Sequence, residues 1–396
     1  MSEQEKIKSK TLPLTGAHAV AEAMRQINPE VVAAYPITPQ TPIIEEYARF
    51  VADGLVQTEM VTVESEHSAL SATVGASAAG VRAMTATSSQ GLALMWEVLG
   101  VASGLRLPIV MPTVNRALSA PINIHCDHSD SMGARDMGWL QIFSETAQEA
   151  YENTLLAVRL AEHPDVLLPA MVMQDGFITS HCVENAEIYP DAAVRKFLGE
   201  YRPRYSLLNT EKPVTIGPLE LQNYYFETKY QQMEAMAKAK SAYLSVGEEL
   251  SEITGRRYPY FEEYELQDAE VAIVVLSSAA GTAKVVVDEL RKQGKKVGLL
   301  KPILFRPFPY EEMAQALSGI RAIAVLDRSV SFGASAPLCG EIKNSLFGLP
   351  KRPKLQSYVF GLGGREIWEK DIEKIYNDLL KGNVNEAEEK YVGLRK

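Results

Sequence analysis

Cysteine is scarce in this chain, and the little that is present is scattered. Its 396 residues include three cysteines, Cys126, Cys182 and Cys339. No CxxC pair or Cys/His ligand spacing joins them, which argues against a zinc site or an iron–sulfur cluster held by this chain. The pattern is typical of reduced thiols, so a cytoplasmic protein is expected.

Long apolar runs are also missing. No stretch of about 18 apolar residues occurs, and the nearest approach, residues 91–97, ends in a carboxylate at Glu97. The N-terminal residues Met1–Lys6 have no apolar segment behind them, so no signal peptide is expected. The sequence therefore predicts a soluble protein that does not enter a membrane.

Positive charge is in the minority. The chain has 40 Lys and Arg against 50 Asp and Glu, which gives a net charge of −10. This balance argues against nucleic acid or an anionic membrane as the main partner. The nucleotide-binding Walker motif, the G-x-S-x-G elbow and the HExxH motif are absent as well, so a serine hydrolase is not supported.

What the chain does have is a regular alternation of strand-like and helix-like segments. Strand-like runs occur at residues 31–34, 60–63, 82–87, 108–113 and 167–173. Helix-like segments at residues 68–79, 91–102 and 145–161 lie between them. Alternation of this kind predicts βαβ units with a parallel sheet and helices on both faces. Residues 1–182 are therefore assigned to a doubly wound α/β domain.

The alternation stops after the first domain and resumes later. Residues 183–266 are predicted to form a connector that contains one long helix, from Gln222 to about Glu252. A second α/β domain, residues 267–396, opens with the buried-strand run Val271–Leu276. Its last segment, Glu369–Lys396, is predicted to be a surface helix with a frayed tail.

The run Tyr35–Pro42 carries the first candidate site residue. It follows the strand-like run Val31–Ala34, and its three prolines stiffen the turn. Thr38 is thereby placed at the carboxyl end of a strand and beside a helix N-terminus, where open α/β sheets bind their ligands. An ordinary proline-rich turn is the alternative.

Polar residues follow the other strands of the first domain too. They are Glu66 after the second strand, the sequence Ser88-Ser89-Gln90 after the third, and Arg116 after the fourth. Each has a structural alternative: a first-turn helix carboxylate, an N-cap and an ion pair, respectively. Their convergence with Thr38 on one sheet edge favours a functional site.

The loop after Arg116 is long and polar. It contains Asn123, His125, Asp127, His128 and Asp130. A loop of this composition is more often functional than not, and these groups could suggest a metal site. Substrate hydrogen bonding is preferred here, because a catalytic metal needs several ligands held on rigid elements. The glycine-rich run Phe360–Arg365 is read as a turn, since it lacks the spacing of a phosphate loop.

Taken together, these motifs resemble a known family. The matching segments are Tyr35–Pro39, Glu64–Ala69, Ser89–Leu92, Asn115–Pro121, Leu168–Val172, Phe197–Tyr201 and Phe305–Pro309. In this order they are similar to the alpha subunit of the 2-oxoacid:ferredoxin oxidoreductases, most specifically the members that act on pyruvate (pyruvate synthases). The similarity spans nearly the whole chain.

The resemblance implies one half of a thiamine diphosphate site. The first domain is then the pyrimidine-type thiamine-diphosphate-binding domain, and the second is a transketolase C-terminal-like α/β domain. A beta subunit would bind the diphosphate and Mg²⁺ and carry a [4Fe–4S] cluster, and gamma and ferredoxin-like delta subunits would complete the assembly. No metal ligand is expected in this chain.

The resemblance also implies roles for individual residues. Glu66 would pair with the pyrimidine ring, with Glu64 as the second choice, and Arg116 would bind the substrate carboxylate. Thr38 would contact the substrate near its carbonyl. Pro36, Ile37, Ser89 and Gln90 would line the cofactor, and Asn123, His125, Asp127 and His128 would line the substrate.

The implied reaction is the conversion of pyruvate, CoA and oxidised ferredoxin to acetyl-CoA, CO₂ and reduced ferredoxin. Two alternatives stay open. The same chemistry could act on another 2-oxoacid, such as 2-oxoisovalerate, 2-oxoglutarate or oxalate. The chain could also be a non-catalytic docking subunit that keeps the α/β scaffold.

Overall fold

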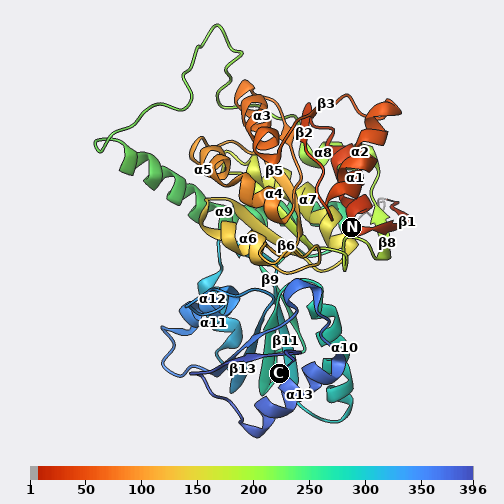
Figure 1. The fold of residues 1–396 in the computed structure, drawn as a ribbon, viewed down its shortest axis with the longest axis vertical. Helices are drawn as coiled ribbons and strands as arrows, with labels where there is room; N and C mark the ends of the chain where they lie inside the picture. The colour runs from red at the N-terminus through yellow and green to blue at the C-terminus, as the bar shows by residue number, and fades with distance from the viewer. Residues whose placement is uncertain (1–7, 396) are drawn as a thin grey trace, which may run out of the picture.

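The computed structural model describes residues 8–395 as two α/β bodies, one above the other (Figure 1). The first body contains a seven-stranded sheet in the order β12-β6-β7-β5-β4-β2-β3. The second contains a six-stranded sheet in the order β15-β14-β13-β10-β11-β9. Met1–Lys6, on which the signal-peptide expectation rests, lie outside the described residues.

The first body is built around six parallel strands. These are β2 (Val31–Ala34), β3 (Glu59–Thr62), β4 (Ala83–Met84), β5 (Val110–Asn115), β6 (Leu140–Ser144) and β7 (Ala170–Asp175). Its helices are α1 (Gly16–Ile27), α2 (Thr41–Ala52), α3 (Glu66–Ala79), α4 (Ser89–Leu94), α5 (Trp96–Gly104), α6 (Ser129–Gly133), η1 (Ala134–Asp136), α7 (Ala147–Ala161) and α8 (Asp191–Leu198). Strands β5, β6 and β7 are buried along their whole length, as expected of a parallel sheet covered on both faces.

The second body repeats this plan on a smaller scale. Its strands are β9 (Phe261–Tyr264), β10 (Val271–Val275), β11 (Val297–Pro302), β13 (Ala322–Asp327), β14 (Lys354–Val359) and β15 (Glu389–Tyr391). Its helices are α10 (Ala279–Lys292), α11 (Tyr310–Leu317), α12 (Pro337–Leu346), η2 (Leu362–Gly364) and α13 (Glu369–Lys381). The long helix α9 (Tyr225–Thr254) runs along the first body before the chain crosses over (Figure 1).

Short strands from outside the predicted domains complete both bodies. Strand β12 (Leu304–Arg306) belongs to the C-terminal segment in sequence but pairs antiparallel with β6. Strand β9, from the predicted connector, pairs antiparallel with β11, and β8 (Val183–Ile188) pairs with β1 (Lys10–Thr15). The domain boundaries at residues 182 and 266 stay predictions, and each of these strand pairings joins segments from two different predicted domains.

The structure differs from the sequence-based predictions at three places. The predicted helix over residues 91–102 is interrupted at Met95, which separates α4 from α5. Strand β6 was not predicted, since its sequence Leu-Gln-Ile-Phe-Ser follows a polar loop without an apolar run before it. The C-terminal tail is not frayed, because β15 adds a parallel strand beside β14.

Local sequence explains where the helices near the strand ends begin. The Ser65 side chain caps α3 by accepting a hydrogen bond from Ser68 N at 3.3 Å. Thr146 caps α7 in the same way, through Glu149 N at 3.2 Å. Within residues 8–395, the helices are too short or too polar to cross a bilayer.

Candidate active site

The carboxyl ends of β2, β3, β4 and β5 bring the predicted site residues to one edge of the first sheet. Because these strands are parallel and adjacent in the order β5-β4-β2-β3, the segments that follow them leave the sheet side by side. Thr38, Glu66, Ser89 and Arg116 all lie on those segments.

Glu66 is a buried carboxylate that has no hydrogen-bond or ionic partner among the described residues. It is the first residue of α3 and is 7% exposed. Among residues 8–395, no hydrogen bond or ion pair reaches its carboxylate. Gly91 lets α4 approach closely, since a Cβ there would lie 2.9 Å from Glu66 Oε1. A buried acid in this state is able to hydrogen-bond a ligand.

Arg116 is a buried guanidinium that no carboxylate pairs with in the part of the chain that the structure describes. Its side chain donates to two backbone carbonyls, from Nη1 to Thr38 at 2.8 Å and from Nε to Asn123 at 3.0 Å. Its burial lowers its pKa, an effect that the nearby carboxylate of Asp130 opposes. No ion pair to Arg116 is present in the described part of the chain. The arrangement leaves the Nη2 group for an anion.

The same contacts bring three predicted substrate residues together. Thr38 is exposed, Asn123 is half-buried, and Arg116 bridges their backbones. The predicted cofactor residues Pro36 and Ile37 precede Thr38 in a turn that Gln40 closes by donating from its backbone N to Ile37 O at 2.7 Å.

Asp130 organises this edge, and its importance was not predicted. Its carboxylate accepts hydrogen bonds from Ser89 N and Arg116 N, each at 3.0 Å, and from Asn115 Nδ2 and Ser131 N. Burial raises its pKa to about 6, although these four donors act in the opposite direction. The aspartate thereby fixes the start of α4 against the end of β5.

The predicted cofactor residues Ser89 and Gln90 lie at that start. Ser89 has a φ of +45°, a backbone conformation rare outside glycine, and its hydroxyl lies 2.6 Å from Ala117 O and 2.7 Å from Gln90 Oε1. Strained backbone of this kind clusters at functional sites. Their contact with a cofactor stays a prediction.

Other residues of the polar loop contact the second body instead. Asn123 Nδ2 donates to Gly363 O at 3.1 Å, and Gly363 N donates to Asp127 Oδ2 at 3.1 Å. A Cβ at Gly364 would lie 2.3 Å from His125 Cβ, so η2 fits closely against the loop. The glycine-rich turn therefore supports the loop, and substrate contacts of His125 and Asp127 stay predictions.

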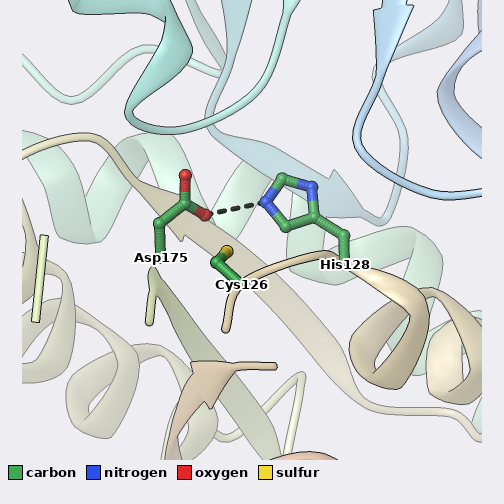
Figure 2. A group of neighbouring side chains, drawn as sticks. All are labelled: Cys126, His128 and Asp175. Atoms are coloured by element: carbon green, nitrogen blue, oxygen red, sulfur yellow. Dashed lines mark hydrogen bonds and ion pairs between the residues drawn. The ribbon is translucent and has the colours of Figure 1, made fainter. Parts of the chain in front are cut away.

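His128 is also turned into the protein. Its Nε2 lies 2.7 Å from Asp175 Oδ1, and both side chains are buried (Figure 2). Asp175 Oδ2 accepts a hydrogen bond from Ser278 N of the second body and lies 3.3 Å from Arg328 Nη1. Burial alone would raise the pKa of Asp175, but Arg328 and His128 hold it well below its ordinary value. His128 acts here at the joint between the bodies, and its predicted substrate contact is untested.

Two clusters within residues 8–395 have donors spaced for a metal ion. One is Cys126, His128 and Asp175, drawn in Figure 2, and the other is Glu145, Glu149 and Glu262. Each already holds a cationic side chain: Arg328 lies beside Asp175, and Lys301 Nζ lies 2.6 Å, 2.6 Å and 2.9 Å from the three glutamates. These cations supply the charge that a metal would bring, so both clusters are interpreted as structural.

Apolar side chains are exposed around the candidate site. They include Leu94 on α4, Trp96 and Val101 on α5, and Ile122 and Ile124 in the loop after Arg116. Apolar surface gathered beside polar site residues is typical of an interface with another molecule.

Comparison with known proteins identifies relatives over nearly the whole chain. Residues 22–248 match the family described as pyruvate flavodoxin/ferredoxin oxidoreductase, thiamine diphosphate-binding, and residues 269–372 match pyruvate:ferredoxin oxidoreductase core domain II. The chain is 60% identical to the pyruvate synthase subunit PorA of Thermotoga maritima, over 96% of this chain and 97% of that one. It is 44% identical to the ketoisovalerate oxidoreductase subunit VorA of Pyrococcus abyssi, over 93% of each.

A solved structure supports the fold. The 2-oxoglutarate:ferredoxin oxidoreductase of Magnetococcus marinus, solved with 2-oxoglutarate, coenzyme A and succinyl-CoA bound, superposes with a TM-score of 0.71 at 20% identity. The match covers 96% of this chain and 66% of that one. The predicted fold class, a thiamine-diphosphate-binding α/β domain followed by a second α/β domain, is confirmed.

Proposed function

Because this chain belongs to the pyruvate flavodoxin/ferredoxin oxidoreductase family, we propose that it is the alpha subunit of a pyruvate synthase. The reaction takes pyruvate, CoA and oxidised ferredoxin to acetyl-CoA, CO₂ and reduced ferredoxin, and is reversible in principle. Identity of 60% over nearly the full length of a PorA subunit supports pyruvate as the substrate.

The observation that carries the proposal is a pair of buried charged side chains that the chain leaves unmatched. Glu66 and Arg116 are 7% and 6% exposed, and neither has an ionic partner among residues 8–395. Burial of an unpaired charge is costly, so such groups are retained where a ligand completes them. A carboxylic acid and a guanidinium on the same sheet edge suit a cofactor nitrogen and a substrate carboxylate.

The residues fit thiamine diphosphate at its pyrimidine end. Glu66 would hold the ring by a hydrogen bond to N1′, and Gly91 leaves room for α4 to approach that carboxylate. When bound, thiamine supplies a nucleophilic carbon that makes the decarboxylation of a 2-oxoacid possible. Glu66 would hold and share the proton at N1′, while Arg116 would orient the substrate by its carboxylate.

Other subunits would supply the rest of the site. We propose a beta subunit that binds the diphosphate and Mg²⁺ and carries a [4Fe–4S] cluster, with gamma and ferredoxin-like delta subunits that pass electrons to ferredoxin. The three cysteines of this chain, two of them buried and all widely separated, support electron transfer through other chains.

A branched 2-oxoacid is the second candidate, and the VorA relative favours it. At 44% identity that subunit matches nearly as much of the chain as the PorA relative does, so family membership alone leaves the substrate side chain open. The larger identity to PorA makes pyruvate the first choice.

The test is co-expression of the full chain with its partner subunits, followed by CoA-dependent reduction of ferredoxin with pyruvate, 2-oxoisovalerate, 2-oxoglutarate or oxalate. We expect thiamine-dependent activity with pyruvate at least about tenfold higher in kcat/KM than with the others. A complex that prefers 2-oxoisovalerate would establish the second candidate. An assembled complex in which Glu66→Gln costs nothing would point to a docking subunit.

A further inference from the structure

A long arm projects from the first body into open space. Residues 200–224 contain no helix or strand and connect α8 to α9, and in Figure 1 they form the extended green loop beyond α3 and α5. An arm of this length without secondary structure is uncommon in a compact domain, and such segments are often functional.

The arm and the first turns of α9 expose an unusual amount of apolar surface. The aromatic residues Tyr205, Tyr224, Tyr225, Phe226 and Tyr230 and the aliphatic residues Leu207, Leu208, Leu219, Leu221 and Met233 are all exposed, Leu219 to 90%. An aromatic residue buries about 150–250 Å² when fully covered, so these partly exposed rings and the aliphatic side chains together approach the ~800 Å² that each partner contributes to a stable interface.

The arm is fixed to the body at two helix ends. Leu207 N donates to Ala78 O at 3.0 Å, and the Ser206 hydroxyl bonds Ala79 O, both at the end of α3. Further along, Ile216 packs in the same apolar cluster as Leu105, which caps the end of α5. The arm is therefore an ordered extension of the α3–α5 surface.

That surface leads directly to the candidate active site. Helix α3 begins at Glu66, about 20 Å from the end that holds the arm. Between them α3 exposes Ser71 and Gly75, a small side chain and a bare backbone that allow a close approach, and α5 exposes Trp96 and Val101. Helix α3 therefore connects the arm, held at its last residues, to the unmatched carboxylate at its first residue.

We propose that the arm, residues 200–224 with the first two turns of α9, is a clamp for the subunit that completes the thiamine site. The inference rests on the proposed function, which requires another chain against Glu66. Continuity of the arm with that face favours this occupant over a second copy of the present chain, because a second copy brings no diphosphate-binding residues to Glu66.

The test compares two variants of the full chain for binding to the co-expressed partner subunit. The arm variant carries Leu219→Ser, Leu221→Ser and Phe226→Ser, at positions where exposed side chains contribute little to folding of the free chain. The control carries Phe347→Ser, at the end of α12 and 90% exposed, and Val285→Ser, on α10 and 47% exposed. We expect about 100-fold weaker association for the arm variant and wild-type association for the control.

Proteolysis gives a second readout that needs no substitution. Trypsin should cut the arm of the free chain after Arg204, because Arg202 and Lys212 each precede a proline and resist cleavage. The assembled complex should protect this site by at least about tenfold. Wild-type association of the arm variant, unchanged cleavage in the complex, or an effect confined to self-association would each overturn the clamp. Failure of the wild-type chain to assemble into a thiamine-dependent enzyme would instead reject the proposed function.

Discussion

Two polar regions of this chain differ in whether their charges are matched. At the joint between the bodies, Asp175 contacts His128, Ser278 and Arg328, and Lys301 lies within 2.9 Å of three glutamates. At the edge of the first sheet, the buried charges of Glu66 and Arg116 have no ionic partner in the described residues.

The comparison separates structural from functional polarity. Both regions contain buried ionisable groups on strand ends and loops, so burial alone does not distinguish them. The joint satisfies its charges within the chain and is expected to fix the two bodies together. At the sheet edge, the charges of Glu66 and Arg116 are available to pair with a ligand, and exposed apolar side chains surround them.

Glu66→Gln is expected to give the largest effect, because it removes the buried acid from the edge of the first sheet. In the reconstituted complex we expect turnover to fall by about 10³- to 10⁴-fold, with subunit assembly unchanged. The matched control is Glu64→Gln, since Glu64 is exposed and its single side-chain bond within residues 8–395 is to Ser68 nearby. Steady-state kinetics decide the matter: loss of activity in the Glu64 variant alone would reverse the assignment.

Lys301→Met tests the opposite region. Burial lowers the pKa of Lys301, but Glu149, Glu145 and Glu262 raise it overall, so the lysine is charged and central to the network. Its removal leaves those carboxylates close together with Lys284 as their remaining cation, at an expected cost of about 3–5 kcal/mol in unfolding free energy.

The control for that variant is Lys292→Met, which breaks the exposed pair with Glu289 and should change stability by under about 1 kcal/mol. Thermal and urea unfolding of the free chain measure both. Equal, small losses in the two variants would mean that the joint is no more important than a surface pair.

The sequence predicted the sheet edge better than the joint, for a physical reason. Strand periodicity and the rule that parallel strands end at one edge suffice to gather Thr38, Glu66, Ser89 and Arg116. Asp130 could not be recognised as their support, because its partners are mostly backbone N–H groups that any sequence provides.

The joint depends on contacts between distant segments, which periodicity does not reveal. Asp175 accepts a hydrogen bond from Ser278, 103 residues away in sequence, and Asp127 accepts one from Gly363, 236 residues away. Strand β12 joins the first sheet from residue 304 for the same reason. His128, predicted as a substrate residue from its polar loop, lies in this joint because the loop packs against the second body.

Arg116→Ala tests the second unmatched charge at the sheet edge. We expect the KM for pyruvate to rise by about 30- to 100-fold, since a charge-assisted hydrogen bond to the carboxylate contributes about 2–3 kcal/mol. Arg116→Lys should recover only part of this loss, because an ammonium lacks the planar pair of donors. The variant and wild type should differ little on methyl pyruvate, which has no carboxylate; an equal loss on both substrates would mean that Arg116 only supports Thr38 and Asn123.

Asp130→Asn is expected to give the smallest effect, and it tests a buried carboxylate at the sheet edge itself. The pKa of Asp130 is raised from 3.8 to about 6 by burial, so the folded chain binds this proton more tightly than the unfolded chain. The carboxyl therefore contributes stability at low pH that is lost as the pH rises from about 4 to about 6, by roughly 1–3 kcal/mol. Urea unfolding across that range should show the stability of the wild type falling relative to that of the variant. A difference that changes in the opposite direction would mean that the four donors outweigh burial, and the sheet edge would then be matched at Asp130 as fully as the joint is at Asp175.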